Sequence, residues 1–144
     1  MKNKMEILLY GHLYKKIFEK YMFPIHKKYD LRQIDIEILY LLYCSGEHNT
    51  SSDIVKSQLF TKGHISQSVS RLEQMGFIAI VSDENDRRCM HLRLTDKALP
   101  VLEQIVSVRN QMYDMIFKNI TDEEKEVMNA AVNKIESNMK EMIQ

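Results

Sequence analysis

The chain has 144 residues, 44% of them apolar and 28% charged, and a formal net charge of zero at pH 7. This length and composition are typical of one globular domain with a substantial core, and they exclude a low-complexity or membrane-spanning chain. Neutrality does not exclude an anionic partner, because local patches matter more for binding than the total charge. Residues 1–32 carry eight Lys and Arg against three Asp and Glu, whereas residues 96–144 carry six against nine.

Two helices are predicted at the start of the chain, over residues 9–25 and 31–43. In the first, apolar side chains recur at helical spacing and form a face that is broad for a terminal helix, which indicates packing beyond its own domain. Pro24 is expected to help stop this helix, and Asp30 is expected to cap the second. Residues 46–49 are then predicted to form a turn.

A third, short helix is predicted from the sequence that follows this turn. Thr50 and Asp53 have the spacing of a capping box, with Asp in place of the usual Glu, and the helix is expected to extend through Leu59. With the helices before and after it, this helix would complete the three-helix body of a helix-turn-helix unit.

The helix predicted between Thr61 and Gly76 has an apolar side and a bare polar side. Thr61 can act as its N-cap, and Gly76 can supply the positive φ that helix ends favour. Ile65, Val69 and Leu72 fall on one face at helical spacing. The opposite face carries small, amide and hydroxyl side chains and almost no acid, so it can approach another surface closely and form hydrogen bonds with it.

A β-hairpin is predicted immediately after this helix. Residues 77–82 and 90–94 are strand candidates on either side of a polar tip, residues 83–88, which contains two adjacent arginines. A helix with a polar face followed by a hairpin with a cationic tip is the layout of a winged helix-turn-helix. Such a helix fits the major groove of DNA, and such a tip fits the neighbouring minor groove.

Two long helices are predicted after the hairpin. The first spans residues 96–117, with Pro100 tolerated in its first turn. The second begins at a capping box of Thr121 and Glu124 and extends to Ile143. We expect the terminal helices, which are apolar on a wide face, to interlock with those of a second copy. The apolar stripe of the last helix comprises Met128, Ala131, Ile135, Met139 and Met142.

The predicted fold is mainly α: a winged helix-turn-helix with a two-stranded β-wing, and terminal helices that form a helical dimerisation region. Residues 1–144 form a single domain in this interpretation. Residues 30–95 are its DNA-binding part, and residues 1–29 and 96–144 are its dimerisation part.

Within this layout, a set of residues follows a fixed order and spacing. The set comprises Thr61, Lys62, Ile65 and Ser66, then Leu72, Glu73 and Gly76, then Asp83, Asp86 and Arg88, and finally Leu94 and Thr95. It resembles the winged helix of the MarR family of bacterial transcription regulators. The resemblance implies a two-fold dimer that binds a pseudo-palindromic operator in double-stranded DNA. The function expected of such a protein is a repressor that a small-molecule effector releases from its operator.

The candidate DNA-binding residues lie on the polar face of the fourth helix and at the tip of the hairpin. We expect the amide of Gln67 to read base edges, and Lys62 and Arg71 to hold phosphates. Asp86 and Arg88 are two residues apart and are predicted to pair, which would orient the guanidinium for the minor groove. The full set is Thr61, Lys62, Gly63, His64, Ser66, Gln67, Ser70 and Arg71 in the helix, and Asp86, Arg87 and Arg88 in the wing.

An effector site is a second candidate, at the junction of the first, second and fifth helices, where the resemblance also implies the family's effector cleft. An aromatic-rich wall with a few polar tips suits a small aromatic or amphipathic molecule. Ordinary interface packing explains the same residues equally well. The candidate lining residues are Tyr10, Tyr14, Phe18, His26, Tyr29 and Tyr43.

Signals for other function classes are weaker. No nucleophile–base pair, phosphate loop or paired carboxylates are evident, so neither an enzyme nor a bound cofactor is expected. The histidines are too scattered to predict a metal site, and the lone thiols of Cys44 and Cys89 indicate a reduced, cytoplasmic protein. No signal peptide or membrane span is predicted. Two alternatives remain: a metal- or oxidant-responsive sensor of the same fold, and a helical interaction protein whose winged helix no longer binds DNA.

Overall fold

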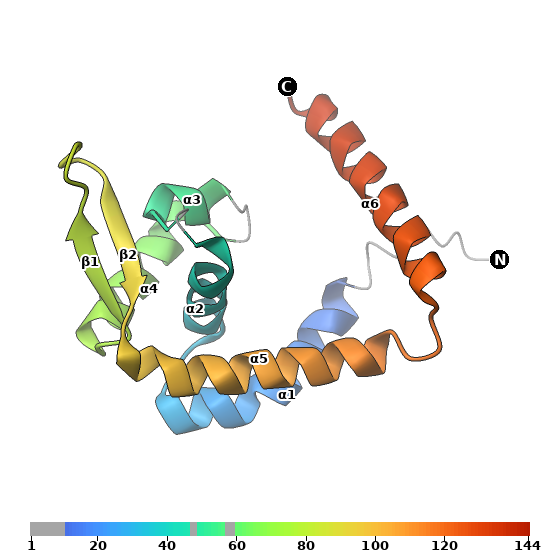
Figure 1. The fold of residues 1–144 in the computed structure, drawn as a ribbon, viewed down its shortest axis with the longest axis horizontal. Coiled ribbons are helices and arrows are strands. Elements are labelled where there is room, and N and C mark those ends of the chain that lie inside the picture. Colours follow the sequence, from blue (N-terminus) through green and yellow to red (C-terminus); the bar gives the residue numbers. More distant parts are fainter. Residues whose placement is uncertain (1–10, 47–48, 57–59) are drawn as a thin grey trace. The chain divides into compact units, whose positions relative to one another are not determined.

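The computed structural model describes residues 11–46, 49–56 and 60–144, and its elements follow the predicted order (Figure 1). The predicted fold class is confirmed, since helices dominate and the hairpin forms one two-stranded sheet. The chain groups into two compact units, which divide after Met112, within α5. The elements are α1 (Gly11–Tyr29), α2 (Gln33–Ser45), α3 (Ser51–Lys56), α4 (Lys62–Gln74), β1 (Ile78–Ser82), β2 (Met90–Leu94), a 3-10 turn (Asp96–Ala98), α5 (Leu99–Ile116) and α6 (Asp122–Met142).

A hydrophobic core lies in the first unit, and α4 contributes the side that the sequence predicted. Ile65, Val69 and Leu72 are buried, with no more than 5% of their surface exposed. They belong to one cluster with side chains of the other elements, among them Met22 of α1 and Ile36 of α2. Burying an aliphatic side chain contributes about 1.5–3 kcal/mol, so this seam determines which side of α4 faces away from the core.

Both ends of α4 are closed as predicted. At the start, Thr61 Oγ1 accepts the backbone N–H of His64 at 3.4 Å. At the other end, Gly76 has a φ of +79°, and the N–H of Phe77 donates to the carbonyl of Leu72 at 3.0 Å. This left-handed residue ends the helix and turns the chain directly into β1.

The wing is an antiparallel hairpin, as predicted, and the structure adds a third segment to its edge. The N–H of Leu92 in β2 donates to the carbonyl of Asn49 at 2.9 Å, and Thr50 forms an isolated bridge with His91. Asn49 was predicted to end a turn, whereas it lies along β2 and pairs with it. The hairpin is therefore attached to the body along this edge as well as at its strand ends.

Two predicted capping boxes are confirmed. Before α3, the N–H of Thr50 donates to Asp53 Oδ2 at 3.0 Å, and the N–H of Asp53 donates to Thr50 Oγ1 at 3.1 Å. Before α6, Thr121 and Glu124 make the same reciprocal pair at 2.8 and 3.2 Å. The predicted end of α3 at Leu59 lies outside the described residues.

The predicted end of α1 is wrong. The helix passes through Pro24 and continues to Tyr29. A proline inside a helix removes one backbone donor and crowds the preceding turn. Met22, two residues before the proline, and Ile25, directly after it, are buried in the core, and their burial holds this stretch of the helix in place. The predicted start of α1 at residue 9 lies outside the described residues.

The boundary between α1 and α2 also differs from the prediction. Asp30 has a φ of 53° and ends α1 rather than capping α2. The N-cap of α2 is Arg32, whose backbone N–H donates to Asp35 Oδ2 at 2.8 Å. A short polar side chain tolerates the left-handed conformation better than most, which explains why this Asp closes one helix instead of opening the next.

The second unit begins at Tyr113 and consists of the end of α5 and α6. Pro100 lies in the first turn of α5, as predicted. None of the residues of α6 is buried within the described chain. The expected division at residue 95 into a DNA-binding and a dimerisation part stays a prediction.

Gly63 in α4 and Gly76 just after it provide a matched test of this geometry. An added Cβ at Gly76 would have only ordinary contacts, at 3.7 Å from Lys97 Cδ, so the cost of Gly76→Ala is its positive φ. We expect a loss of about 1–2 kcal/mol in the free energy of unfolding. Nothing lies within 4 Å of a Cβ at Gly63, and Gly63→Ala should instead stabilise by about 0.5–1 kcal/mol. Urea denaturation measures both; equal effects would contradict the assigned helix end.

Candidate nucleic-acid interface

The outer face of α4 presents most of the predicted DNA-contacting residues to solvent. The burial of Ile65 and Leu72 on one side leaves the opposite side free. Thr61 Oγ1 and His64 Nδ1 lie 3.0 Å apart, so the N-cap and the first turn share one local arrangement. The exposed positions are Thr61, Lys62, Gly63, His64, Ser66, Gln67 and Ser70.

Arg71 differs from the other predicted residues of α4 because its guanidinium is engaged within the fold. Its Nη1 donates to Asp35 Oδ2 at 2.6 Å, and its Nη2 donates to the carbonyl oxygen of Asp30 at 2.6 Å. Only 26% of the Arg71 side chain is exposed. These contacts direct its charge toward α2 and the end of α1, so its predicted phosphate contact has no support in the geometry.

Sequence reasoning missed two residues that bear on this face, Asp35 and Arg32. Asp35 has no exposed surface, and Arg32 lines a hollow of about 610 Å³ on the outer side of α4. The available signal was the helical spacing of Asp35 from Ile38, Leu39 and Leu42, which places this acid on the apolar side of the predicted helix. An acid at such a position needs a buried partner. The remaining residues of the hollow are Gln67, Ser70, Arg71 and Gln74.

Two acidic side chains shape the tip of the wing. Asp83 Oδ1 accepts the backbone N–H groups of Asn85 and Asp86 at 2.8 and 3.1 Å. Asp86 Oδ1 accepts the backbone N–H of Arg88 at 3.0 Å. The predicted pairing of Asp86 with the Arg88 guanidinium is therefore wrong, because the tip is folded into turns and is not an extended strand. The carboxylate of Asp86 instead fixes the backbone that carries Arg88.

The base of the tip is tied to the body through His91. Its Nε2 lies 2.7 Å from Asp83 Oδ2, and its Nδ1 lies 2.6 Å from Asn49 Oδ1. The hydrogen bond from His91, together with the two backbone N–H donors, lowers the pKa of Asp83 below its ordinary value. The Asp83 carboxylate therefore stays ionised to a lower pH than an ordinary aspartate does.

The two arginines of the tip remain available. Arg87 and Arg88 are exposed, and neither forms an ion pair with another described residue. The acids beside them accept backbone N–H groups instead. The wing thus ends in two free guanidinium groups on an ordered turn, on the same unit as the exposed face of α4.

This architecture is similar to solved MarR structures. A MarR protein from Peptoclostridium difficile matches with a TM-score of 0.79 at 22% sequence identity, over 99% of this chain and 91% of that one. The S. aureus MepR–DNA complex matches with a TM-score of 0.60 at 22% identity, over 92% of this chain and 98% of that one. At these identities the likeness establishes the fold alone.

Sequence comparisons establish the family. Residues 31–98 match a family described as a winged helix DNA-binding domain. The HTH-type transcriptional regulator BilQ of Clostridioides difficile is 35% identical over 86 residues, 59% of this chain and 58% of that protein. The uncharacterized HTH-type transcriptional regulator YwhA of Bacillus subtilis is 32% identical over 98 residues, 68% of this chain and 70% of that protein. The chain belongs to the MarR family. Members of this family are transcriptional regulators and not enzymes.

Three of the predicted effector residues of this MarR-family chain lie in two ring pairs. The rings of Tyr14 and Phe18 lie 6.2 Å apart, and those of Tyr43 and Tyr40 lie 6.5 Å apart. The guanidinium of Arg109 in α5 joins the two pairs, because it lies 5.3 Å from the centre of the Phe18 ring and 3.8 Å from the centre of the Tyr40 ring. Tyr10 lies outside the described residues. An effector site built from all of them therefore stays a prediction.

The other two predicted effector residues lie near the end of α1. His26 Nδ1 is 2.6 Å from the carbonyl oxygen of Leu31, and Gln104 Nε2 donates to the Tyr29 hydroxyl at 2.7 Å. A cavity of about 310 Å³ between α1 and α5 contains none of the six. Its lining residues are Tyr21, Pro24, Ile25, Glu103, Gln104, Ser107 and Val108.

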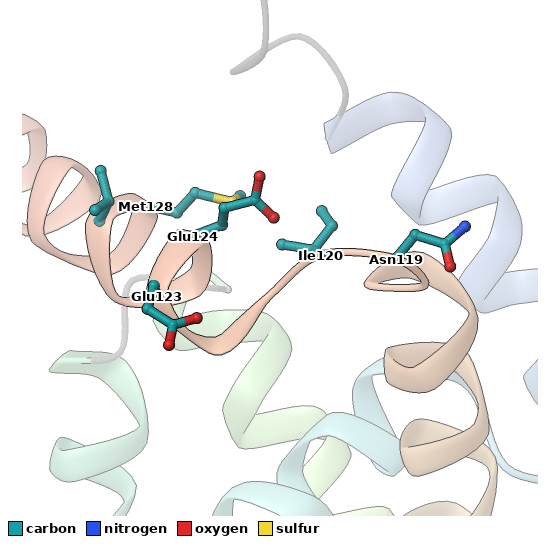
Figure 2. Close-up of a pocket in the computed structure, with 6 residues that line it drawn as sticks. Asn119, Ile120, Glu123, Glu124 and Met128 are labelled. Carbon is teal, nitrogen blue, oxygen red and sulfur yellow. The ribbon is translucent and has the colours of Figure 1, made fainter.

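The second unit of this MarR-family chain has an exposed apolar surface. A hollow of about 540 Å³ at the start of α6 is lined by Ile120, Val127 and Met128, with Asn119, Glu123 and Glu124 at its polar positions. Figure 2 shows Ile120, Glu124 and Met128 along this hollow. Val132 and Met139, further along α6, are 57% and 46% exposed.

The described part of the chain gives no support for a metal site or for a membrane-spanning helix. No three His, Cys, Asp or Glu side chains there gather as metal ligands would. Cys44 and Cys89 are both free thiols, the first exposed and the second half-buried. No helix among the described residues is long and apolar enough to cross a membrane.

Two substitutions of Asp86 separate the effect of its charge from that of its hydrogen bond. Asp86→Asn keeps an Oδ1 acceptor for the Arg88 N–H and removes the negative charge, so we expect DNA affinity equal to or tighter than that of the wild type. Asp86→Ala removes both and should weaken binding by about 0.5–1.5 kcal/mol, because the turn is lost. Fluorescence anisotropy with labelled duplex DNA measures both variants. Tighter binding by Asp86→Ala would mean that the tip acts only through its charge.

Proposed function

We propose that this chain is a dimeric, sequence-specific DNA-binding transcription regulator that acts as a repressor. The observation that carries the proposal is the exposed polar face of α4 beside a wing whose two arginines have no internal ion pair. Because both belong to one compact unit, they can contact neighbouring grooves of the same duplex. Such a regulator would act on DNA in the cytoplasm.

The residues of α4 suit a division between base readout and backbone contact. Gln67 offers both an amide donor and an acceptor to base edges, and His64 and Ser66 lie beside it. Lys62, in the first turn, is an exposed cation for phosphate. Gly63 has open space around its Cα, which permits a close approach of the helix backbone. Thr61 and Ser70 extend the same polar face.

The wing completes the proposed contact with DNA. A narrow minor groove concentrates negative potential and attracts Arg. Arg87 and Arg88 lie on a turn held by Asp83 and Asp86, so less conformational freedom is lost when they enter the groove. The S. aureus MepR–DNA complex, whose fold this chain shares, supports DNA as the partner.

Dimerisation is proposed from α6, which has no buried residue within the described chain. Its exposed apolar stripe, with Val132 and Met139, would be covered by a second copy of this chain. Two-fold symmetry would place two copies of α4 about 34–36 Å apart, on half-sites one DNA turn apart. A pseudo-palindromic operator follows from this symmetry.

Release by a small aromatic or amphipathic effector is the final part of the proposal. The exposed rings of Tyr14 and Tyr43 offer flat apolar surfaces, and the hydroxyl of Tyr29 offers a polar group. The metal- or oxidant-sensor alternative would need ligands or a reactive thiol that no observation on the described residues favours.

Two variants test the division of roles on α4, with an operator selected by the wild-type protein from random-sequence DNA. Gln67→Ala should relax preference at one or two operator positions and cost roughly 1–3 kcal/mol there. Lys62→Ala should weaken binding to all sequences alike and reduce the salt slope by about one unit. Mobility-shift titrations at several salt concentrations measure both effects. A uniform loss of affinity in both variants would contradict base readout by Gln67, and a selection that yields no preferred sequence would contradict the proposed function.

The dimer is tested with a charge placed on either side of α6. Val132→Glu puts a carboxylate into the proposed apolar interface, and it should shift the protein toward monomer and weaken operator binding. Ser137→Glu, on the opposite side of the helix by its 3.6-residue period, is the matched control and should leave the dimer intact. Sedimentation velocity over a dilution series distinguishes them. A wild-type monomer at micromolar concentration that still binds its operator with full affinity would contradict the proposal.

A further inference from the structure

The carboxylate of Asp35 in the first turn of α2 is fully buried and has a polar partner at each oxygen. The hydroxyl of Ser68, on the buried side of α4, donates to Oδ1. The backbone N–H of Arg32 and Nη1 of Arg71 donate to Oδ2 at 2.8 and 2.6 Å. Two of these three donors come from α4, so the buried charge fixes α4 at two points of its length.

The same guanidinium reaches a third element. Arg71 Nη2 donates to the carbonyl oxygen of Asp30 at 2.6 Å and lies 3.2 Å from Asp30 Oδ2. Asp30 is the left-handed residue that ends α1. A planar guanidinium holds its donors in a fixed fork. Arg71 therefore links α4 to α2 and to the end of α1 at the same time.

We propose that Arg71 is a positioning residue for sequence readout, which acts by setting the orientation of α4, and that it is not a phosphate contact. This inference rests on the proposed binding of an operator. Gln67 and Ser70 line the hollow on α4 together with Arg71. A small rotation of α4 would therefore move their polar atoms away from the base edges they read.

Two arguments support positioning over phosphate binding. The apolar seam of Ile65, Val69 and Leu72 tolerates small sliding, because apolar contacts are non-directional. A buried charge loses its partners when the helix slides, so it selects a single register. In addition, Asp35 already balances the charge of Arg71, so the guanidinium keeps little electrostatic attraction for a DNA phosphate.

The test compares the wild type with Arg71→Lys and with a double variant, Asp35→Asn with Arg71→Met. Lysine keeps the charge but lacks the fork that spans Asp35 and Asp30. The double variant removes both charges together, so no buried ion is left unpaired. Lys62→Ala is the matched control for a phosphate contact. Each protein is titrated with the selected operator and with a scrambled duplex at several salt concentrations, and its thermal midpoint is recorded.

We expect both variants to lose about tenfold or more in the ratio of operator to scrambled-duplex affinity, a loss on the scale of a mismatched base pair. Their salt slopes and their affinities for the scrambled duplex should stay at the wild-type values. An Arg71→Lys protein with wild-type specificity, or a double variant whose salt slope falls by about one unit as in Lys62→Ala, would overturn the inference. A lower thermal midpoint with an unchanged affinity ratio would also overturn it, since Arg71 would then serve stability alone.

A measurement without DNA keeps this inference separate from the proposed function. Residual dipolar couplings of backbone amides report the direction of α4 relative to α2 and α1 in the free protein. We expect this direction to change in Arg71→Lys and to be unchanged in Lys62→Ala. A wild-type direction in Arg71→Lys would overturn the inference even if the protein selected no operator.

Discussion

The carboxylate of Asp35 constrains the winged helix more than any single apolar contact does. Removing an ion from water costs several kcal/mol unless protein groups replace the lost hydration. Here those groups come from the backbone of Arg32 and the side chains of Ser68 and Arg71. Removing one partner from a buried pair typically costs about 3–5 kcal/mol. The relative placement of α2 and α4 is therefore strongly restricted, while the outer side of α4 stays free.

The wing uses its acids in a comparable way. The carboxylates of Asp83 and Asp86 accept backbone N–H groups of the tip, so their charges serve the local fold. The pKa of Asp83 is lowered by His91 and by these N–H donors. The stabilisation from its ionised form is present above the ordinary pKa of Asp and is lost only as pH falls through the lowered value. The neighbouring Arg87 and Arg88 stay exposed. A chain of zero net charge can thus present cations and amides on one surface, because two acids beside them, Asp83 and Asp86, are used internally.

The local features of this fold could be predicted from the sequence, and the contacts between distant residues could not. The caps at Thr61, Thr121 and Gly76 depend on residues a few positions away, and so does the hairpin. The pairing of Arg71 with Asp35 spans 36 positions, and periodicity contains no information about it. Arg71 was predicted to face a phosphate for that reason. The predicted end of α1 was wrong because the rule that a proline stops a helix ignores the burial of Ile25 beyond Pro24.

The last helix, α6, also shows what local sequence patterns can and cannot predict. The capping box of Thr121 and Glu124 and the apolar stripe predicted α6 correctly, yet no residue of this helix is buried within the described chain. Local propensity can define where a helix begins, but helices in proteins gain most of their stability from packing an apolar face. With Val127, Val132 and Met142 more than half exposed, α6 lacks that packing among the described residues. The sequence pattern that specifies α6 therefore includes an apolar surface that the described residues leave exposed, and this is the physical ground for proposing that a second copy covers it.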